Sequence, residues 1–520
     1  MDDGRMTSAS SVGLVMANGP WLFFILSFTL ALLLMFFTSR NRLPPGPKGL
    51  PLIGNVLDMP NGQEWKTFAE WGRQYGGICS VTLLGQPMII INSADIMAEL
   101  DKKGTLYSDR PRLEMGGELV GYSRALALMP YGDRFRAYRR HFSRIIGTPK
   151  ATSKYNALEE AETHKFLQRV AKNPDGLPQH LRKTAGAIIM KIAYGIEVLE
   201  ENDPFVELIE YANDHFSAAT APGAFLVDVF PSLRHIPASF PGGGFHTLAA
   251  KWAQSFNDMV EVPYAHARDL MRQGKAPSSL LTTALENEDK LSEEDIFVLK
   301  HTAASLYAGG ADTTVSTQHA FFLAMIRHPD VQRKAQAEID AVVGNDRLPG
   351  FRDRERLPYV NAVVTEAFRW HSIAPTGVPH RATEDGIIAG QFIPKGSLII
   401  VNLWNMTHDP DTYPNPFEFD PDRFLSTPGK PVQKDPRQIC FGFGRRICPG
   451  LNLAEASVWL CIVMSLAVLD IKPVMGEDGK PIIPELENTN GTISHPVPFK
   501  YNVKPRSEKA MALISSEIAN

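Results

Sequence analysis

The sequence predicts a mainly helical protein with a minor β region. Residues 291–327 form a long, mostly apolar segment without proline, which is typical of one long helix. Residues 292–295, Ser-Glu-Glu-Asp, are expected to cap its start, and the helix is expected to end before Pro329. Residues 357–370 have the pattern of a second helix, and residues 386–401 alternate between apolar and polar around Pro394-Lys395-Gly396, as strands joined by a turn do. We therefore expect one long central helix with further helices around it and a small sheet.

Composition indicates one large globular unit. The 520 residues carry a net charge of -4, with 21% charged and 44% hydrophobic residues. This balance can build a large core, and it provides no overall basic field for nucleic acid. No Ser/Gly-rich linker, charge run or internal repeat divides the chain. We expect residues 56–520 to form a single catalytic domain.

Residues 21–38 are predicted to form a transmembrane helix. No charged residue lies between Arg5 and Arg40, and as a helix the apolar run would be about 27 Å long, close to the hydrocarbon thickness of a bilayer. The competing interpretation is a cleaved signal peptide. The run is long, Trp21 stands at its start, and no small-residue cleavage site follows. We favour a single-pass anchor, with residues 1–20 as a short lumenal segment.

Residues 39–55 are predicted to form a basic, proline-rich hinge. Arg40, Arg42 and Lys48 follow the anchor, and residues 44–47 read Pro-Pro-Gly-Pro. Basic residues mark the cytoplasmic end of a membrane span, and prolines cannot continue its helix. The domain after the hinge is therefore expected on the cytoplasmic side.

A basic segment lies at residues 131–144. Such a helix face is more often solvated than functional, but two functions are open to it. Inner arginines could bind acidic groups of a cofactor, and outer ones could receive an acidic redox protein. The arginines are Arg134, Arg136, Arg139, Arg140 and Arg144.

The long central helix has an unusual tract at residues 309–314, Gly-Gly-Ala-Asp-Thr-Thr. Two glycines and two β-branched threonines lower helical propensity at one place. Glycines let a flat ligand and dioxygen approach the backbone, while Asp312 and Thr313 offer a proton route and a hydroxyl. The alternative is a packed groove between helices, with the threonines bonding back to the preceding turn.

The second helix carries Glu366 and Arg369 three positions apart, close enough to pair on one face. Apolar neighbours one turn away suggest a partly buried pair, and such a pair needs a further partner. Arg423 is the candidate, and the network would support structure without touching substrate. His380, after this helix, is a candidate cofactor contact, as is its neighbour Arg381.

Residues 441–450 carry the strongest signal, because they read F-x-x-G-x-R-x-C-x-G. This glycine-bent loop presents Cys448 beside Arg446, with Phe441 and Gly444 at its start. One thiolate offered alone suits an iron that already has four equatorial ligands, and haem supplies those. Beside this loop, the functional interpretation of residues 309–314 is favoured over the packing one.

Other roles for Cys448 fit less well. The remaining cysteines, Cys79, Cys440 and Cys461, form no C-x-x-C pair for zinc, and four scattered cysteines do not suggest a disulfide framework. Measured from Cys440, the aromatic, glycine and arginine positions are occupied by other residues, namely Gln433, Pro436 and Gln438. The remaining alternative is a plain buried cysteine.

With these motifs in this order, the chain resembles a membrane-bound cytochrome P450. The resemblance rests on the proline-rich hinge and on four motifs, at residues 309–314, 366–369, 421–424 and 441–450, and it covers nearly the whole chain. Within the family, the tract GGADTTVS, the segment RWHSIAP and the ending around residues 495–499 look similar to filamentous-fungal enzymes of secondary metabolism. That group includes members labelled O-methylsterigmatocystin oxidoreductase-like and fungal tryptamine hydroxylases.

The resemblance implies roles for individual residues. Cys448 would be the axial ligand of haem b (iron protoporphyrin IX), with Phe441 on the thiolate side and Gly444 also among the cofactor-binding residues. Asp312 and Thr313 would manage proton delivery. The residues implied at the haem propionates are Arg446, Arg110, Arg139 and His380, and the implied structural triad is Glu366, Arg369 and Arg423. Phe135 departs from the family, because a tryptophan usually stands there and phenylalanine has no N–H to donate.

The implied activity is a monooxygenase reaction that inserts one oxygen atom from O2 into a lipophilic organic substrate. Electrons would come from a separate NADPH-cytochrome P450 reductase, docking near Arg140 and Arg445, with cytochrome b5 as a further possible donor. The implied location is the endoplasmic reticulum membrane. A haem-thiolate isomerase or dehydratase that does not use O2, and a non-catalytic haem-binding protein, are the alternatives; the pair Asp312 and Thr313 speaks against the first.

Five segments are expected to contact the substrate. All are mostly apolar, which favours a lipophilic molecule. They are residues 113–128, 216–230, 305–309, 374–378 and 491–494.

Overall fold

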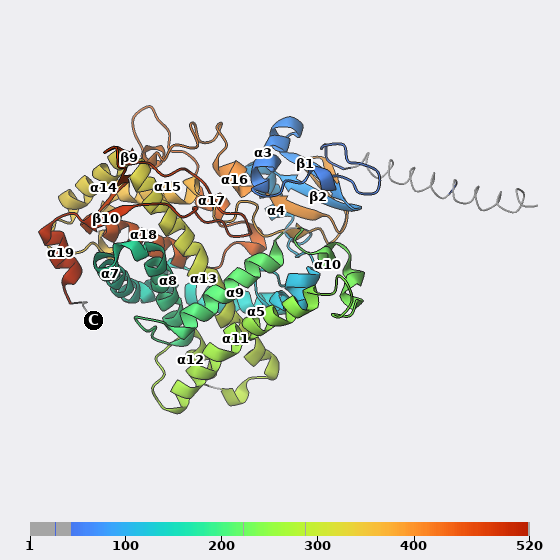
Figure 1. Cartoon of the computed structure of the whole chain (residues 1–520), viewed down its shortest axis with the longest axis horizontal. Helices are drawn as coiled ribbons and strands as arrows, with labels where there is room; N and C mark the ends of the chain where they lie inside the picture. Colours follow the sequence, from blue (N-terminus) through green and yellow to red (C-terminus); the bar gives the residue numbers. More distant parts are fainter. Residues whose placement is uncertain (1–26, 28–42, 222, 287, 518–520) are drawn as a thin grey trace, which may run out of the picture.

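The computed structural model describes residues 27, 43–221, 223–286 and 288–517, and it is mainly helical with small sheets, as predicted (Figure 1). The longer helices are α3 (Glu64–Tyr75), α4 (Ala94–Lys102), α5 (Asp133–Ile146), α7 (Asn156–Lys172), α8 (Leu177–Tyr194), α9 (Pro204–Thr220), α11 (Phe245–Arg272), α13 (Glu293–Arg327), α14 (Pro329–Val342), α15 (Pro358–Trp370), α18 (Leu451–Val468) and α19 (Glu508–Ser515). Short helices are α6 (Pro149–Thr152), α10 (Leu226–Val229), α12 (Leu280–Leu285), α16 (Leu403–Thr407) and α17 (Arg437–Cys440).

The sheets are short. The strands are β1 (Ile78–Leu83), β2 (Gln86–Ile91), β3 (His380–Arg381), β4 (Gly386–Ile388), β5 (Gln391–Ile393), β6 (Leu398–Val401), β7 (Leu469–Lys472), β8 (Val474–Met475), β9 (Pro481–Ile482) and β10 (Asn502–Pro505). The largest sheet has the order β1-β2-β6-β3, and its β2–β6 pair is parallel, with Ile89 opposite Ile399. The strands predicted within residues 386–401 are thus present as β4, β5 and β6. Gly396 has a φ of 82° before β6, a left-handed conformation that favours glycine.

Helix α13 is the predicted long central helix, and it begins where the sequence indicates. The Ser292 hydroxyl accepts a hydrogen bond from the Asp295 backbone N–H (3.1 Å), and the Asp295 carboxylate accepts one from the Ser292 backbone N–H (3.0 Å). This reciprocal capping satisfies two donors at the helix start. The helix ends at Arg327, two residues before Pro329.

The main core lies where α13 packs with α7, α8, α15 and α18. Its largest fully buried side chains include Phe166, Phe321, Phe322 and Trp459. In the part of the chain that the structure describes, α18 is the one helix apolar and long enough to cross a bilayer, but 72% of it is buried inside the protein. Burial identifies α18 as a core helix, and it rigidly supports the loop that precedes it.

The predicted lumenal segment and transmembrane anchor, residues 1–38, lie outside the described residues except for residue 27, as do residues 39–42 of the hinge. The described part of the hinge, residues 43–55, lies beside β1 in the structure. The Pro44 carbonyl accepts a hydrogen bond from the Ser80 hydroxyl (2.6 Å), and the Pro45 carbonyl accepts one from the Ser80 backbone N–H (3.0 Å). This part of the hinge is therefore attached to the domain and does not act as a free spacer.

Candidate active site

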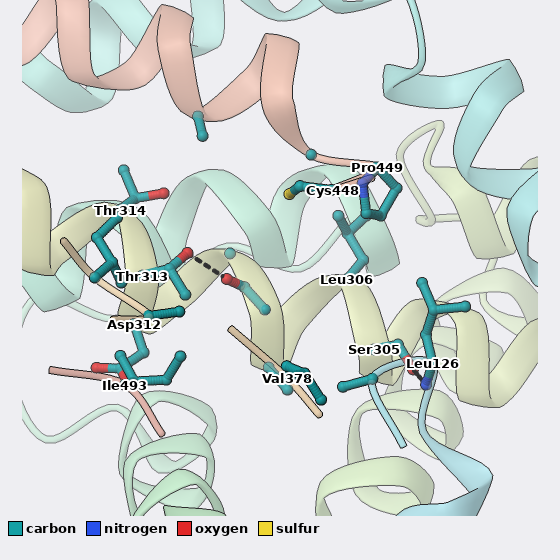
Figure 2. Close-up of a pocket in the computed structure, with 18 of the residues that line it drawn as sticks. Leu126, Ser305, Leu306, Asp312, Thr313, Thr314, Val378, Cys448, Pro449 and Ile493 are labelled. Atoms are coloured by element: carbon teal, nitrogen blue, oxygen red, sulfur yellow. Dashed lines mark hydrogen bonds between the residues drawn. The ribbon is translucent and has the colours of Figure 1, made fainter. Parts of the chain in front are cut away.

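A cavity of about 390 Å³ lies between α13 and the loop that leads into α18. Figure 2 shows Cys448 on one side of it and Asp312, Thr313 and Thr314 along α13. The structure thus brings together the two motifs that the sequence placed more than a hundred residues apart. Much of the remaining wall comes from α5, α8, α9 and α11, from Phe368 of α15, and from loop residues within 122–127, 371–378 and 492–493.

The loop at residues 441–450 is bent by local geometry. Gly442 and Gly444 have φ values of 74° and 58°, and a side chain at Gly444 would collide with the Asp101 carboxylate. The Phe441 carbonyl accepts a hydrogen bond from the Cys448 backbone N–H (2.8 Å), which closes the loop. The Phe441 ring packs against Phe368, with 5.3 Å between centroids. Gly444 shapes the loop and does not itself line the cavity.

Cys448 lies at the N-terminus of α18. Burial raises the pKa of the Cys448 thiol, while the backbone N–H groups of Gly450 and Leu451 and the charge of Arg139 act to lower it. Such donors stabilise a thiolate. Cys440 also borders the cavity, and burial beside Asp435 raises the pKa of its thiol far above the ordinary value. Of the two, Cys448 has the environment suited to a thiolate ligand.

Three arginines and one histidine from four parts of the chain meet at one edge of the cavity. Arg110 donates to the carbonyls of Val378 (2.6 Å) and Pro379 (2.8 Å), and its Nε donates to Ala127 (2.9 Å). Burial lowers the pKa of Arg110 well below its usual range, and the neighbouring charge of Arg446 lowers it further.

The other members of this group also have carbonyl partners. Arg446 donates to the carbonyls of Ser108 and Met129, both at 2.7 Å, and Arg139 donates to that of Ile447 (2.7 Å). The His380 ring stacks on Phe443, with its Nδ1 2.6 Å from the Tyr107 carbonyl. Burial lowers the pKa of Arg446 to about 10 and that of His380 well below its ordinary value.

Among the described residues, no carboxylate lies within ion-pair distance of Arg110, Arg139, Arg446 or His380. The nearest acid in electrostatic terms is Asp109, whose carboxylate accepts a hydrogen bond from the Tyr131 backbone N–H (3.0 Å). Buried cations without a counter-charge are costly, and an anionic ligand removes that cost. The arrangement fits a cofactor that brings two carboxylates to this edge and an iron to Cys448, as haem does. Arg381, also a sequence candidate, is exposed and does not line the cavity.

Phe135 contributes a contact that the sequence comparison did not foresee. Its ring is buried, and the Arg446 guanidinium lies over it at 3.9 Å from the centroid. A cation–π contact of this kind orients the arginine without any N–H group. The phenylalanine therefore supports Arg446, although it cannot donate a hydrogen bond to a carboxylate.

The two adjacent glycines of α13 have different surroundings. A methyl group at Gly310 would come within 2.7 Å of the Ile189 side chain of α8, so Gly310 serves close helix packing. A methyl group at Gly309 would meet no atom within 4 Å, and Gly309 lines the cavity. The Thr313 hydroxyl donates to the Gly309 carbonyl at 2.7 Å. The packing interpretation thus holds at Gly310 and in the Thr313 back-bond, while the open space at Gly309 is compatible with the functional interpretation, which stays a prediction.

Asp312 has a partner that the sequence analysis missed. Its Oδ1 lies 3.1 Å from Nε2 of His495, and the two side chains are about one-fifth exposed. The residues are far apart in the sequence, and neither a motif nor a spacing connects them. Only the folded chain reveals this pair.

Glu366, Arg369 and Arg423 come together away from the cavity. Glu366 accepts from Arg369 at 2.7 and 2.8 Å, and its Oε1 lies 3.4 Å from Nε of Arg423. All three side chains are buried, and the arginines also donate to backbone carbonyls, including those of Thr407, Asn415 and Pro416. The network fastens α15 to the segment that precedes the cysteine loop.

All five segments expected to meet the substrate contribute to the cavity wall, as do several residues that were not expected. The wall includes Tyr122, Leu126, Phe216, Ser305, Ala308, Val378, Thr492 and Ile493. His301, a further wall residue, has Nδ1 2.9 Å from the Phe297 carbonyl, and burial lowers the pKa of His301 to about 4, so its ring is neutral at pH 7. A polar group from α13 and a mostly apolar wall suit a lipophilic ligand.

Known proteins resemble this chain over almost its whole length. A model of the cytochrome P450 family matches residues 44–503. Cytochrome P450 monooxygenase 208 of Postia placenta is 51% identical over 480 residues, covering 92% of this chain and 93% of the relative. Cytochrome P450 monooxygenase claR of Ampulloclitocybe clavipes is 46% identical over 488 residues, 94% and 90% of the two chains. The tryptamine 4-monooxygenase of Psilocybe cyanescens is 38% identical over 485 residues, 92% and 95%.

Proposed function

Because the chain belongs to the cytochrome P450 family and is a haem-thiolate monooxygenase, we propose that it inserts one oxygen atom from O2 into a lipophilic small molecule of fungal secondary metabolism or into a xenobiotic. Its named relatives are monooxygenases, which favours this activity over an isomerase or dehydratase that does not use O2. The observation that carries the proposal is Cys448 facing Thr313 across one cavity, which Gly309 also lines (Figure 2).

The family implies a haem cofactor, and we propose haem b, with Cys448 as its axial ligand. The bound haem supplies the iron at which O2 is reduced and oxygen is transferred to the substrate, and a thiolate ligand favours O–O cleavage. Arg110, Arg139, Arg446 and His380 would bind the propionates: the charges of the three arginines lack acidic partners among the described residues, and the His380 ring lies close to Arg110 and Arg446. The backbone N–H groups at the start of α18 would hold the Cys448 sulfur in place.

Asp312 and Thr313 are the proposed proton-handling residues. Asp312 can hold a proton on its carboxylate, and Thr313, whose hydroxyl is fixed by the Gly309 carbonyl, can hold a water or a substrate oxygen beside Gly309. Gly309 leaves room for such a group because it has no side chain. The apolar wall would exclude other water, so that protons enter at a defined place.

The family also implies a redox partner, and we propose an NADPH-cytochrome P450 reductase, with cytochrome b5 as a second donor. Arg140 of α5 and Arg445 of the cysteine loop are both exposed, and Arg445 donates to the Tyr131 hydroxyl (2.8 Å), just before α5. Reversing both charges should slow reduction by the reductase and weaken its salt dependence. The same reversal at Lys480, an exposed lysine elsewhere, is the control. Unchanged reduction in the double variant would contradict this docking site.

We further propose that residues 21–38 anchor the protein in the endoplasmic reticulum membrane, with residues 56–520 as the cytoplasmic catalytic domain. Exposed apolar side chains support a membrane-facing end. Leu52 lies in the hinge, Leu57 follows it, and Leu226 and Phe240 lie in and after α10; each is more than half exposed. Figure 1 shows α10 and strands β1 and β2 at the same end of the molecule. Alkaline carbonate extraction of microsomes should leave the full chain in the membrane fraction and release a chain lacking residues 1–38.

A reduced carbon monoxide difference spectrum tests the central claim. The wild type should give the thiolate-type band, and Cys448→Ala should lose it while Cys440→Ala keeps it. Persistence of the band in Cys448→Ala would contradict the ligand assignment. Expression with the reductase and screening of aromatic, terpenoid and steroid compounds for NADPH-dependent products then identifies the substrate class.

A further inference from the structure

The contact between Asp312 and His495 points to a role for His495, which the sequence analysis placed only in the ending around residues 495–499. We propose that His495 is a proton-relay residue that positions Asp312 and resupplies it with protons during O2 reduction. Its Nε2 lies 3.1 Å from Asp312 Oδ1. Among the described histidines, His495 is the one with a carboxylate at ion-pair distance. This inference rests on the proposed function, in which Asp312 supplies protons to the cavity.

The backbone of His495 is held firmly. Its N–H donates to the Thr489 hydroxyl (3.0 Å), and its carbonyl accepts from the Thr489 backbone N–H (2.8 Å). The next residue, Pro496, forms an antiparallel bridge with Asn488. The imidazole therefore meets Asp312 from a fixed position, as positioning of a catalytic carboxylate requires.

The segment that carries His495 is docked along one face of α13. Asp312, Ser316 and His319 lie at positions i, i+4 and i+7 of the helix, so they share a face. Asp312 contacts His495, the Ser316 hydroxyl donates to the Ser494 carbonyl (2.6 Å), and the His319 ring stacks on Phe499 with 4.6 Å between centroids. Because Thr492 and Ile493 line the cavity, the same segment borders the cavity and reaches Asp312.

Two other histidines face this region, and neither is suited to carry a proton at neutral pH. Burial lowers the pKa of His371 to about 3 and that of His319 to about 4. The His371 ring is occupied by the Ser316 hydroxyl at 2.7 Å. His495, by contrast, is partly exposed and paired with a carboxylate. Histidine is also the side chain whose charge ordinarily changes between about pH 5 and 8.

Ionisable groups that are partly exposed at the surface lie close to Asp312. Burial raises the pKa of Glu210 of α9, and the negative charges of Asp214 and Asp312 raise it further. Glu210 therefore lies close to Asp312. Arg182 of α8 lies 3.9 Å from Glu210, and both are partly exposed. Asp312 thus stands between ionisable groups at the surface and Thr313 at the cavity.

The proposed step conserves charge and involves no electron transfer. Imidazolium Nε2–H of His495 passes its proton to Asp312 Oδ1, which leaves a neutral imidazole and a carboxylic acid. Asp312 then releases the proton into the cavity beside Thr313, and His495 takes another from solvent. The pair returns to its starting state after each proton.

The first test measures His495 itself. Carbethoxylation of each histidine by diethyl pyrocarbonate at a fixed pH, followed by mass spectrometry, reports how fast each ring nitrogen reacts. In Asp312→Ala the rate at His495 should rise several-fold, because Nε2 of His495 no longer has a carboxylate at 3.1 Å. His235, which is exposed, should keep its rate. An unchanged rate at His495 would overturn the pairing.

The second test measures oxygen reduction with NADPH, O2 and the reductase as the only reactants. His495→Gln should release more hydrogen peroxide per NADPH than the wild type and show a larger solvent deuterium isotope effect, while His235→Gln matches the wild type. His495→Asn provides a second, smaller replacement. A His495→Gln protein with wild-type peroxide yield and isotope effect would overturn the relay. The thiolate-type carbon monoxide band should persist in these variants, and its absence from the wild type would instead contradict the proposed function.

Discussion

The protein buries arginines in two places and satisfies them in opposite ways. Arg369 and Arg423 share the carboxylate of Glu366, and all three side chains are almost fully buried. Arg110 and Arg446, at the edge of the cavity, donate to backbone carbonyls. Within the described residues, the first group carries its own counter-charge and the second does not.

The difference distinguishes the structural network from the proposed binding site. Breaking a buried ion pair leaves an uncompensated charge in the protein interior, so the first network matters to the fold whether or not a ligand is present. For the second group, we propose that an anionic ligand supplies the missing counter-charge. Variants in the two groups should therefore fail in different assays, and the following experiments test this contrast.

The largest effect is expected from Glu366→Gln. An amide would leave two buried arginines without a counter-charge, which costs about 3–5 kcal/mol in the free energy of unfolding. Urea unfolding of the purified protein and the yield of haem-containing protein measure it. Glu355→Gln, at an exposed glutamate, is the control. A loss below about 1 kcal/mol would mean that the network is dispensable.

Arg446→Ala and Arg110→Ala should weaken haem binding and leave the stability of the haem-free protein almost unchanged. Each removes one charged donor of the type that contributes about 1.5–3 kcal/mol to a buried contact, so haem should dissociate roughly 10- to 100-fold faster. Transfer of haem to apomyoglobin measures the rate, and unfolding of the haem-free protein should change little. Arg445→Ala, at an exposed neighbour, serves as the reference. If the variants lost haem no faster than Arg445→Ala but had a less stable apoprotein, these arginines would belong to a structural network and not to a binding site.

Glu159 provides a third case, a buried acid that has no basic partner in the part of the chain that the structure describes. Its Oε2 accepts from the Ser457 hydroxyl (2.7 Å), and burial raises the pKa of Glu159 to about 8. The folded state therefore holds the proton more tightly than the unfolded state does. This contribution to stability is complete below about pH 4.5 and is lost as pH rises through 8. Between pH 7 and 9 the wild type should lose about 1 kcal/mol that Glu159→Gln does not. Parallel pH dependences of unfolding would contradict the raised pKa.

The smallest effect is expected at Phe135. Phe135→Leu keeps the site apolar but removes the ring beneath Arg446, a contact of about 1 kcal/mol, so haem should dissociate a few-fold faster. Phe135→Trp restores the N–H donor usual in the family and should slow haem loss if the larger ring fits. Equal rates in all three proteins would show that Arg446 is oriented by its carbonyl partners alone.

Several features of the fold were predicted from local patterns in the sequence. The cap at Ser292, the proline-free run to Arg327 and the turn before β6 all lie where the sequence indicated, because each depends on residues a few positions apart. The cysteine loop belongs to the same class, since its glycines and the spacing to Cys448 are local. Local chemistry was thus sufficient for the fold class, the family and the expected iron ligand.

The contacts that complete the site could not be read in this way. The sequence predicted that Arg423 pairs with Glu366. No sequence pattern indicated that His495 contacts Asp312 or that the Phe135 ring packs against Arg446. These partners come from segments that are brought together only when helices pack, and many sequence positions could have supplied them.

The sequence alone determined the helical fold, the haem-thiolate family and the identity of Cys448, Asp312 and Thr313 as candidates. The tertiary structure decided which glycine opens to the cavity, which cations lack acids and which histidine faces Asp312. The physical reason is the sequence distance over which each interaction acts. Capping, turns and helix periodicity act within a few residues, whereas burial and counter-charge depend on what the whole fold places nearby.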